Sequence, residues 1–153
     1  MDINVATNIS KEFKNIEIKI QAPEMTEKLK KTIGTIMEIF NQTKQIIGTK
    51  DSKIYLLKTD EIICFYSEEK NNYCKTENGI YKIKEKLYEL EEKLSNGNYV
   101  RISNSCIINL EFVKSFDTSL IGSIEVIFKD GSKEYVSRRR IKEIMKKVKE
   151  WGN

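Results

Sequence analysis

The sequence contains no histidine, and this absence narrows the function classes more than any other feature. Histidine is the usual general base near neutral pH and the commonest zinc ligand. The three cysteines lie too far apart in the chain to supply the close pairs of a cysteine-only zinc site. The sequence also lacks a glycine-rich phosphate loop and a GxSxG nucleophile motif. We therefore expect no enzyme, no metal site and no cofactor.

The sequence also has little that would hold the chain in a membrane or cross-link it. No segment approaches the roughly 20 apolar residues of a membrane-spanning helix. The N-terminus, MDINVATNISKEF, has neither a basic head nor an apolar stretch, so we expect no signal peptide. Cys64, Cys74 and Cys106 lie in apolar or strand-like runs, which favours reduced, buried thiols. Reduced thiols are typical of a cytoplasmic protein. The abundance of Lys, Ile, Glu and Asn is typical of AT-rich bacterial genomes, so we expect a bacterial source.

Positive charge is present, and it is unevenly placed. The net charge of +4 and the pI near 8.8 are mildly basic, which permits a polyanionic partner without requiring one. The segment from Arg138 to Lys149 carries three arginines and four lysines against the single carboxylate of Glu143. The positive field of the chain is therefore concentrated at its C-terminal end.

The closing helix is expected to begin with these arginines. Ser137 is a favourable N-cap residue, and apolar residues follow it at helical spacing: Ile141, Ile144, Met145, Val148 and Trp151. A cation at a helix N-terminus costs roughly 0.3–1 kcal/mol. A bound anion such as phosphate would compensate for Arg138, Arg139 and Arg140, because guanidinium groups pair with phosphate bidentately. The alternative is a solvated basic surface turn.

The N-terminal part of the chain reads as a short β–α unit. Residues 13–20 alternate between apolar and polar side chains, which predicts a strand. Pro23 suits the first turn of a helix, and apolar residues recur after it at three- and four-residue spacing: Met25, Leu29, Ile33, Ile36, Met37 and Phe40. Residues 1–43 are too few to be stable alone, so we expect this extension to pack on the rest of the chain or to dimerise.

From residue 44 to residue 153 the sequence predicts a second unit made mostly of antiparallel hairpins. Turns are expected at Asp51-Ser52 and at Asn78-Gly79, the latter a dipeptide that type I′ turns favour. Residues 84–95 predict a short helix that buries its leucines, with its charged residues, Glu91 among them, on a solvated face. The expected fold class is mostly β with short helices, an α+β arrangement.

Three polar clusters interrupt the β-rich part. The first, residues 67–73, is expected to expose Lys70 and Asn72 near a bend, and the others are residues 101–105 and 137–140. Asparagine can read adenine bidentately, arginine can bind guanine or phosphate, and serine can donate to phosphate oxygens. The alternative is that these are ordinary turn residues bonded to their own backbone.

Three segments carry a resemblance to a known family: LYELEEKL, YVRISNSCIINLEFV and YVSRRRIKEI. Over roughly residues 45–150 the chain resembles the LytTR DNA-binding domain of bacterial transcription regulators. Unlike the better-known members, this chain is expected to have no receiver domain in front of the matched segment. It is similar instead to the small stand-alone regulators of this family, which begin with a short β–α segment.

The resemblance implies an antiparallel β fold whose loops enter successive major grooves of DNA. Matched position by position, the base-reading residues would be Asn72, Asn104 and Arg139. Family members often have histidine at the first of these positions, so in this chain Lys70 or Tyr73 could take that contact instead. The residues expected to contact the DNA backbone are Lys70, Arg101, Ser103, Ser105, Arg138 and Arg140.

The sequence thus predicts a sequence-specific regulator of transcription whose partner is double-stranded DNA. One alternative is a ligand-sensing or oligomerisation module, in which the N-terminal unit binds a small molecule or a second copy to form a homodimer. The other is an RNA-binding module. Stand-alone members are often encoded beside a membrane protein, which implies a membrane-protein regulatory partner. The DNA-binding interpretation requires the turn at Asn104 and the arginines near residue 139 to share one edge of the molecule.

Overall fold

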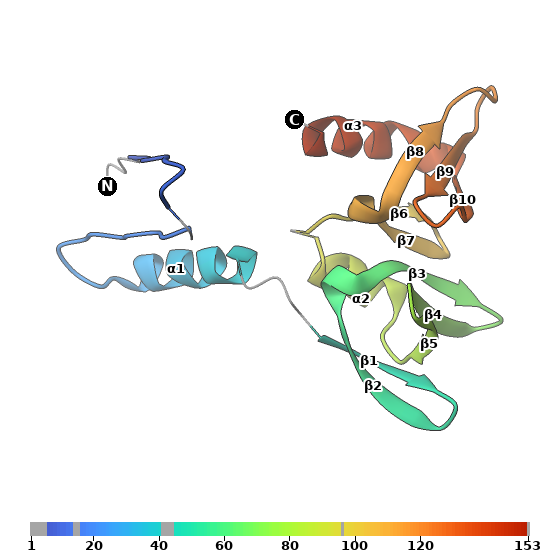
Figure 1. Cartoon of the computed structure of the whole chain (residues 1–153), viewed down its shortest axis with the longest axis horizontal. Coiled ribbons are helices and arrows are strands. Elements are labelled where there is room, and N and C mark those ends of the chain that lie inside the picture. The colour runs from blue at the N-terminus through green and yellow to red at the C-terminus, as the bar shows by residue number, and fades with distance from the viewer. Residues whose placement is uncertain (1–5, 14–15, 41–44, 96, 153) are drawn as a thin grey trace.

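A computed structural model describes residues 6–13, 16–40, 45–95 and 97–152 of the chain. Ten strands form two antiparallel sheets, and three α-helices and three short 3₁₀ turns accompany them (Figure 1). This confirms the mostly-β fold class. The helices are α1 (Glu27–Phe40), α2 (Leu87–Lys93) and α3 (Ile141–Trp151), and the 3₁₀ turns are η1 (Thr59–Glu61), η2 (Leu110–Phe112) and η3 (Arg138–Arg140).

The first sheet has seven strands in the order β2-β1-β5-β4-β3-β7-β6. Its strands are β1 (Gln45–Lys50), β2 (Lys53–Lys58), β3 (Ile62–Glu68), β4 (Asn71–Thr76), β5 (Gly79–Ile83), β6 (Tyr99–Ser103) and β7 (Cys106–Asn109). The second sheet is ordered β10-β9-β8, from β8 (Val113–Asp117), β9 (Ile124–Phe128) and β10 (Lys133–Val136). Every pairing in both sheets is antiparallel.

Short turns set the register of the hairpins, because a two-residue loop fixes which residues face each other. Asp51 and Ser52 both have positive φ, 50° and 60°, as a type I′ turn requires, which confirms the first predicted turn. The second predicted turn is wrong by one residue. Thr76 pairs with Gly79, so Glu77 and Asn78 form the loop. Gly79 begins β5 at a φ of 142°, a conformation that glycine adopts without strain.

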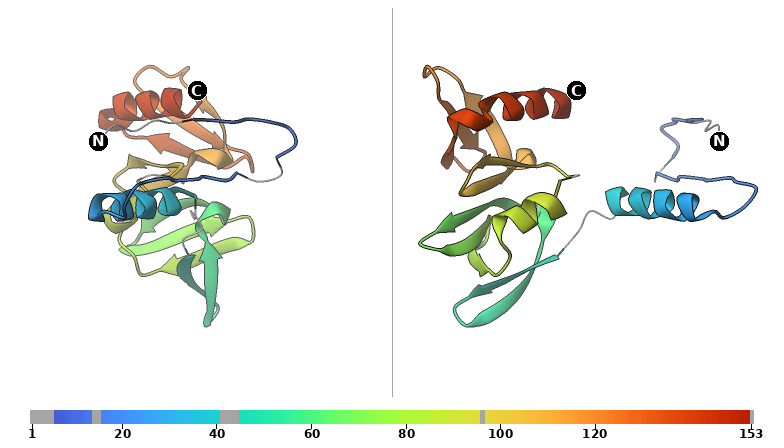
Figure 2. Two further views of the ribbon diagram at one scale, coloured as in Figure 1. Left: turned by 90° about the vertical axis from the view of Figure 1, so that its left-hand side faces the viewer. Right: turned by 180° about the vertical axis from the view of Figure 1, so that it is seen from behind.

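The two faces of the first sheet are covered by different elements (Figure 2). Helix α2 covers one face over a core that includes Phe65, Tyr81 and Leu90. The second sheet and α3 cover part of the other face, where Ile108, Phe128 and Ile144 are buried together. Lys75 of β4 fastens the two sheets, because its ammonium lies 2.7 Å from the Asp130 carboxylate and donates to the Ser132 hydroxyl at 2.9 Å.

The three cysteines are free thiols, and all three are buried, as expected. Burial raises the pKa of the Cys74 thiol to about 12. A hydrogen bond with Cys64, together with burial, raises the pKa of Cys106. Because the thiolate is the reactive form, Cys74 and Cys106 behave as apolar core residues.

The N-terminal segment departs from two expectations. Phe13 and residues 16–20 belong to no strand, and Lys14 and Asn15 lie outside the described residues. A strand needs a neighbour for its backbone groups, and this segment has none among the described residues. The helix begins at Glu27, four residues after Pro23, and Thr26 caps it by accepting from the Leu29 amide at 3.1 Å. The predicted domain boundary after residue 43 lies outside the described residues.

Candidate nucleic-acid interface

Three turns from separate parts of the chain lie on one edge of the β-rich domain (Figures 1 and 2). They are the β3–β4 turn at Glu69 and Lys70, the β6–β7 turn at Asn104 and Ser105, and η3. Backbone hydrogen bonds hold them in place. The Ser67 amide donates to the Ser105 carbonyl at 2.9 Å, and the Ser137 amide donates to the Ile102 carbonyl at 2.8 Å. We call these three turns together the polar edge.

Asn104 and Arg139 are in direct contact on the polar edge, although 35 positions separate them in the sequence. The Nη2 group of Arg139 donates to Oδ1 of Asn104. Both side chains are exposed. This contact confirms the prediction that the asparagine turn and the arginine segment share one edge. It leaves the amide nitrogen of Asn104 and other guanidinium N–H groups of Arg139 directed to solvent or to a ligand.

The start of the last helix differs from the prediction. Arg138, Arg139 and Arg140 form a 3₁₀ turn, and the α-helix begins at Ile141. The Ser137 side chain makes no capping hydrogen bond; instead the backbone carbonyl of Ser137 accepts from the Arg140 amide at 2.9 Å. The arginines therefore precede α3, and the tight turn points successive side chains in different directions.

The Arg101 side chain stabilises the β6–β7 turn by donating hydrogen bonds to its backbone. Its Nε donates to the Ser103 carbonyl at 3.0 Å, and its Nη2 donates to the Asn104 carbonyl at 2.7 Å. Its Nη1 lies 2.8 Å from a carboxylate oxygen of Glu91, and only 15 % of the side chain is exposed. Each nitrogen of the Arg101 guanidinium group therefore has a partner within the chain, which favours a supporting role over the expected contact with the DNA backbone.

Glu91 of α2 is the residue of this region that the sequence analysis missed. It was expected on a solvated face, but it is half-buried and lies between two guanidinium groups. Its second oxygen lies 3.7 Å from Nη1 of Arg140, whose side chain is 19 % exposed. Arg140 thus points inward, unlike Arg139, although its buried Nε has no hydrogen-bond partner among the described residues. The sequence indicated this position only indirectly, since Glu91 directly follows the buried Leu90 in α2.

Asn72 lies in strand β4, and both ends of its amide are used within the chain. Its Nδ2 donates to the Glu85 carbonyl at 2.8 Å, and its Oδ1 accepts from the Ser67 hydroxyl at 2.6 Å. The side chain is half-buried. The expectation of an exposed Asn72 is wrong, because the hairpin turns at Glu69 and Lys70 and Asn72 lies beyond the turn, paired with Ser67 in the sheet. Lys70, at the turn itself, is exposed.

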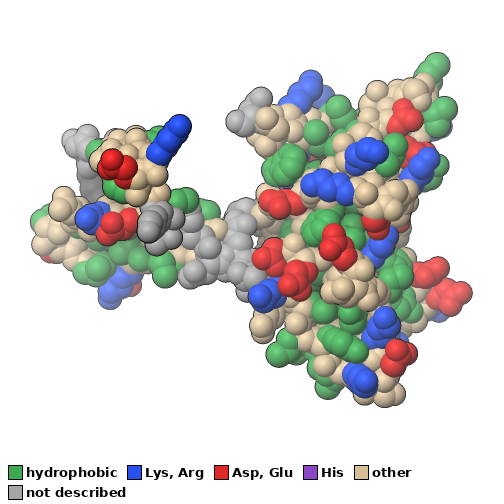
Figure 3. Space-filling model, viewed as in Figure 1, with side chains coloured by type: hydrophobic (Ala, Val, Ile, Leu, Met, Phe, Trp, Pro, Cys, Tyr) green, Lys and Arg blue, Asp and Glu red, His purple; other side chains and the backbone are tan. Residues whose placement is uncertain are grey.

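The remaining predicted residues differ in how freely they can reach a ligand. The hydroxyls of Ser103 and Ser105 lie 3.3 Å apart, and the Ser105 amide donates to the Ser103 hydroxyl at 3.2 Å. The side chain of Arg138 is exposed and has no hydrogen bond or ion pair within the described part of the chain. Cations thus dominate the turn before α3, whereas two carboxylates, Glu68 and Glu69, directly precede Lys70. Figure 3 shows Asp and Glu side chains, in red, at the end of the β3–β4 hairpin.

The electrostatics of the polar edge follow from this arrangement. Exposed donors are concentrated at Asn104, Arg138 and Arg139, and the nearest carboxylate, Glu91, is occupied by the two inward-pointing arginines. Guanidinium and amide donors on one exposed edge suit acceptor-rich surfaces such as phosphates and the guanine edge in a major groove. Within the described residues, no cluster of His, Cys, Asp or Glu could hold a metal ion.

Comparisons with known proteins bear on the family and the fold of the chain. The LytTr DNA-binding domain matches residues 52–149. HTH-type transcriptional regulators from Staphylococcus aureus are similar over 131 residues, covering 86 % of this chain and 88 % of theirs; that of strain MSSA476 is 30 % identical and that of strain NCTC 8325 is 28 % identical. A LytTr DNA-binding domain from Bacillus cereus superposes with a TM-score of 0.64 at 17 % identity, over 67 % of this chain and 94 % of that one. The chain belongs to the LytTR family of DNA-binding domains.

Proposed function

We propose that this protein regulates transcription by binding duplex DNA through the polar edge, with Asn104 and Arg139 contacting base edges. The observation that carries the proposal is the contact between these two side chains, which brings two base-reading residue types to one exposed position. The similar staphylococcal proteins are named as transcriptional regulators, and this supports the regulatory role.

The residues of the polar edge fall into two groups, those that contact DNA and those that hold the turns in place. Arg138 and Lys70 are exposed cations on either side of Asn104, and we assign them to phosphates, together with the Ser103 and Ser105 hydroxyls. Arg101, Arg140 and Glu91 fix the turns from beneath. Preorganised donors lose little conformational entropy on binding, so the buried network contributes to affinity without touching DNA. Asn72 serves as a structural tie between β4 and the segment before α2.

We also propose a role for each of the two parts of the chain. Residues 44–153 form the DNA-binding unit, and residues 1–43 form an extension that engages a partner. None of the described helices is long and apolar enough to cross a membrane. A cytoplasmic regulator controlled by a membrane protein is consistent with that finding. The exposed apolar residues of the extension favour a second protein chain over a small molecule, because no described residue of this segment is buried to form a pocket.

The test is DNA binding by two alanine variants. Bound fragments are first selected from random duplex DNA, and the preferred duplex is labelled for fluorescence anisotropy. Arg139→Ala and Asn104→Ala should each weaken binding to that duplex by about 1–3 kcal/mol. Their melting temperatures should stay close to the wild-type value, because both side chains are exposed. Lys58→Ala, an exposed cation on β2, is the matched control and should bind as the wild type does.

Two outcomes would contradict the proposal. Unchanged affinity of both variants for the selected duplex would exclude the polar edge as the reading surface. Equal binding to an RNA duplex of the same sequence would favour an RNA-binding module, because the deep, narrow major groove of A-form RNA does not admit such side chains.

A further inference from the structure

One face of the first sheet is only partly covered. The residues of β3 on this face, such as Cys64, pack against the second sheet, and Lys75 marks the border. Beyond that border, β5, β1 and β2 continue the same face without cover. Paired residues on antiparallel strands point to the same side of the sheet. Ile47 pairs with Leu56, Thr49 with Ile54, and Lys75 with Ile80. Four aliphatic side chains therefore lie together on this face: Ile47, Ile54, Leu56 and Ile80.

These four side chains form an exposed apolar patch. Ile47, Ile54, Leu56 and Ile80 are between 48 % and 74 % exposed, whereas the opposite face of the same strands is buried under α2. We call them the bare sheet face. Strand β2 is also an edge of the sheet, so one side of its backbone has no strand beside it. Contiguous apolar patches of this kind on a soluble protein mark interaction surfaces, and an open edge adds a second means of pairing.

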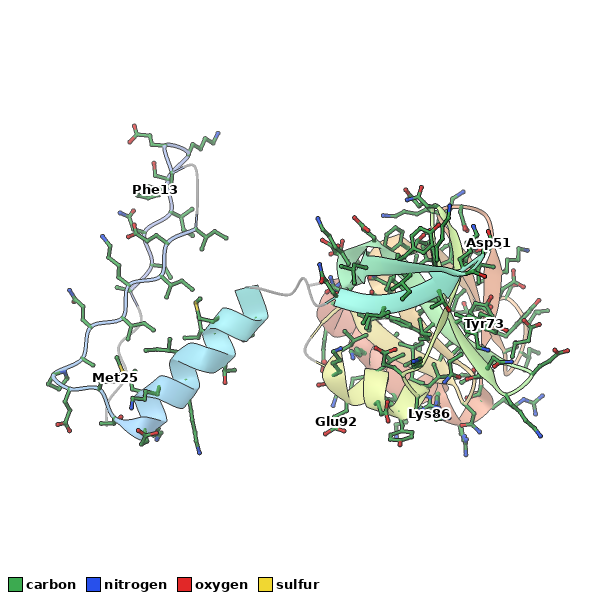
Figure 4. All side chains as sticks on the ribbon, turned by 90° about the horizontal axis from the view of Figure 1, so that it is seen from below. Phe13, Met25, Asp51, Tyr73, Lys86 and Glu92 are labelled. Carbon is green, nitrogen blue, oxygen red and sulfur yellow. The ribbon has the colours of Figure 1, made fainter. Side chains whose placement is uncertain are left out.

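The N-terminal segment also carries apolar side chains that the rest of the described chain does not bury. No described residue between 6 and 40 is buried. Its apolar side chains line one stripe of α1, where Leu29, Ile33 and Ile36 recur at helical spacing, and an extended stretch in which Ile16, Ile18 and Ile20 alternate. Figures 1 and 4 show the segment standing away from the β-rich domain, with Phe13 and Met25 far from it.

We infer that the N-terminal segment of a second copy of this chain covers the bare sheet face, with the α1 stripe against Ile54 and Leu56. An amphipathic helix on a half-exposed sheet is the common way to complete such a layer. Each copy gives its helix and receives its partner's, so the exchange closes with two-fold symmetry and buries two helix–sheet contacts.

A second copy fits better than two alternatives. One is folding of the N-terminal segment back onto the sheet of its own chain, and the other is a coiled coil of two α1 helices. Only four residues separate Phe40 from Gln45, and short hinges favour exchange between copies over folding back. Helix α1 has 14 residues, about two heptads, which is too short for a stable two-stranded coiled coil of two α1 helices. The bare sheet face shares no residue with the polar edge, so the dimer leaves both reading edges open.

The first experiment measures the oligomeric state of the full chain by sedimentation velocity across a wide concentration range. The wild type should dimerise. Leu56→Glu and Ile33→Glu should each abolish the dimer but remain folded, since neither side chain is buried within one chain. Their urea unfolding should stay cooperative, with a midpoint that no longer depends on protein concentration. Lys53→Glu changes the charge of β2 on its other face and should remain dimeric. A wild type that is monomeric throughout would overturn the inference, as would a dimer that survives Leu56→Glu.

The second experiment identifies which chain supplies the helix. Two chains of different length, one carrying Ile33→Cys and the other Leu56→Cys, are mixed and treated with a flexible bismaleimide; the native cysteines are buried and serve as an unreactive background. A cross-link between the two chains is the expected product. A doubly substituted chain that cross-links only to itself, while the mixture yields nothing, would assign the helix to its own sheet and overturn the exchange. Anisotropy with the selected duplex reports DNA binding separately, so the two proposals fail independently.

Discussion

At the scale of single residues, Asn72 and Asn104 show how surroundings decide the role of one side chain. Both carry the same amide, but the amide of Asn72 is satisfied on both ends by Glu85 and Ser67. The amide of Asn104 is exposed and meets Arg139. The arginines divide in the same way, because Arg139 faces outward while Arg140 turns toward Glu91. Chemical type predicts what a residue can bind, and the direction of its side chain decides whether it does.

Glu91 gives the sharpest prediction at this scale. Glu91→Gln removes the carboxylate that neutralises Arg101 and Arg140, whose side chains are mostly buried. Leaving such donors without a charged partner costs about 1–3 kcal/mol, so we expect the free energy of unfolding in urea to fall by that amount. DNA affinity should fall as well, because Arg101 holds the carbonyls of Ser103 and Asn104.

The neighbouring Glu92 supplies the matched control for this prediction. It is exposed on the same helix, and Glu92→Gln should leave both stability and DNA affinity near the wild-type values. A Glu91→Gln variant as stable as Glu92→Gln would show that the carboxylate network does not support the edge.

At the scale of elements, the hairpins and the helix faces could be predicted and several boundaries could not. The Asp51-Ser52 turn and the buried leucines of α2 follow from local chemistry and periodicity, and the structure confirms both. Residues 16–20 have the alternation of a strand, but a strand forms only where another strand offers its backbone. Similarly, Ser137 suits a helix cap, but its side chain makes no capping hydrogen bond and the chain enters a 3₁₀ turn before the α-helix.

The candidate site shows the same division between local and long-range information. The family resemblance was enough to select Asn104 and Arg139, and the contact between them supports their pairing. The inward orientation of Arg101 and Arg140 depends on Glu91, a residue on another element, which no spacing within residues 101–105 or 137–140 encodes. Contacts between distant elements therefore mark the limit of what this sequence alone could predict.

The tie between the two sheets gives a prediction about pH. The ammonium of Lys75 lowers the pKa of Asp130 to about 2, below the value near 3.9 of an unfolded chain. A carboxyl whose pKa is lower when folded stabilises the fold above the unfolded value, and this contribution is lost as the pH falls through about 2. We therefore expect stability to decline between about pH 4 and pH 2 less steeply in Asp130→Asn than in the wild type.

Urea unfolding at pH 7, 4 and 2 measures this difference, with Asp60→Asn, an exposed carboxylate on η1, as control. Asp130→Asn should also be less stable than the wild type at pH 7, because the Lys75 ammonium loses its charged partner. Parallel pH profiles for Asp130→Asn and the wild type would show that this pair does not couple the sheets.

At the scale of the whole molecule, the net charge of +4 matters less than where the free charges lie. Within the described structure, Glu91 forms ion pairs with two basic side chains near the polar edge, Arg101 and Arg140, whereas the Arg138 side chain has no partner. A protein of modest net charge can bind DNA when its unpaired cations gather on one edge, since only contacts with phosphate release counterions.

Arg138 should therefore act on all duplexes alike. Arg138→Ala is expected to weaken binding to selected and unrelated DNA by a similar factor. It should also reduce the slope of log K against log salt by about 1, as the loss of one phosphate contact predicts. Fluorescence anisotropy at several salt concentrations measures the slope. An effect confined to the selected duplex would assign Arg138 to base reading instead.

Base reading by Arg139 from the polar edge is decided by repeating the selection from random duplex DNA with Arg139→Ala. We expect the selected sequence to lose its preference at the position that Arg139 contacts and to keep it elsewhere, with discrimination there reduced by about 1–3 kcal/mol. An Arg139→Ala protein that selects the wild-type sequence with undiminished preference at every position would show that Arg139 does not read bases.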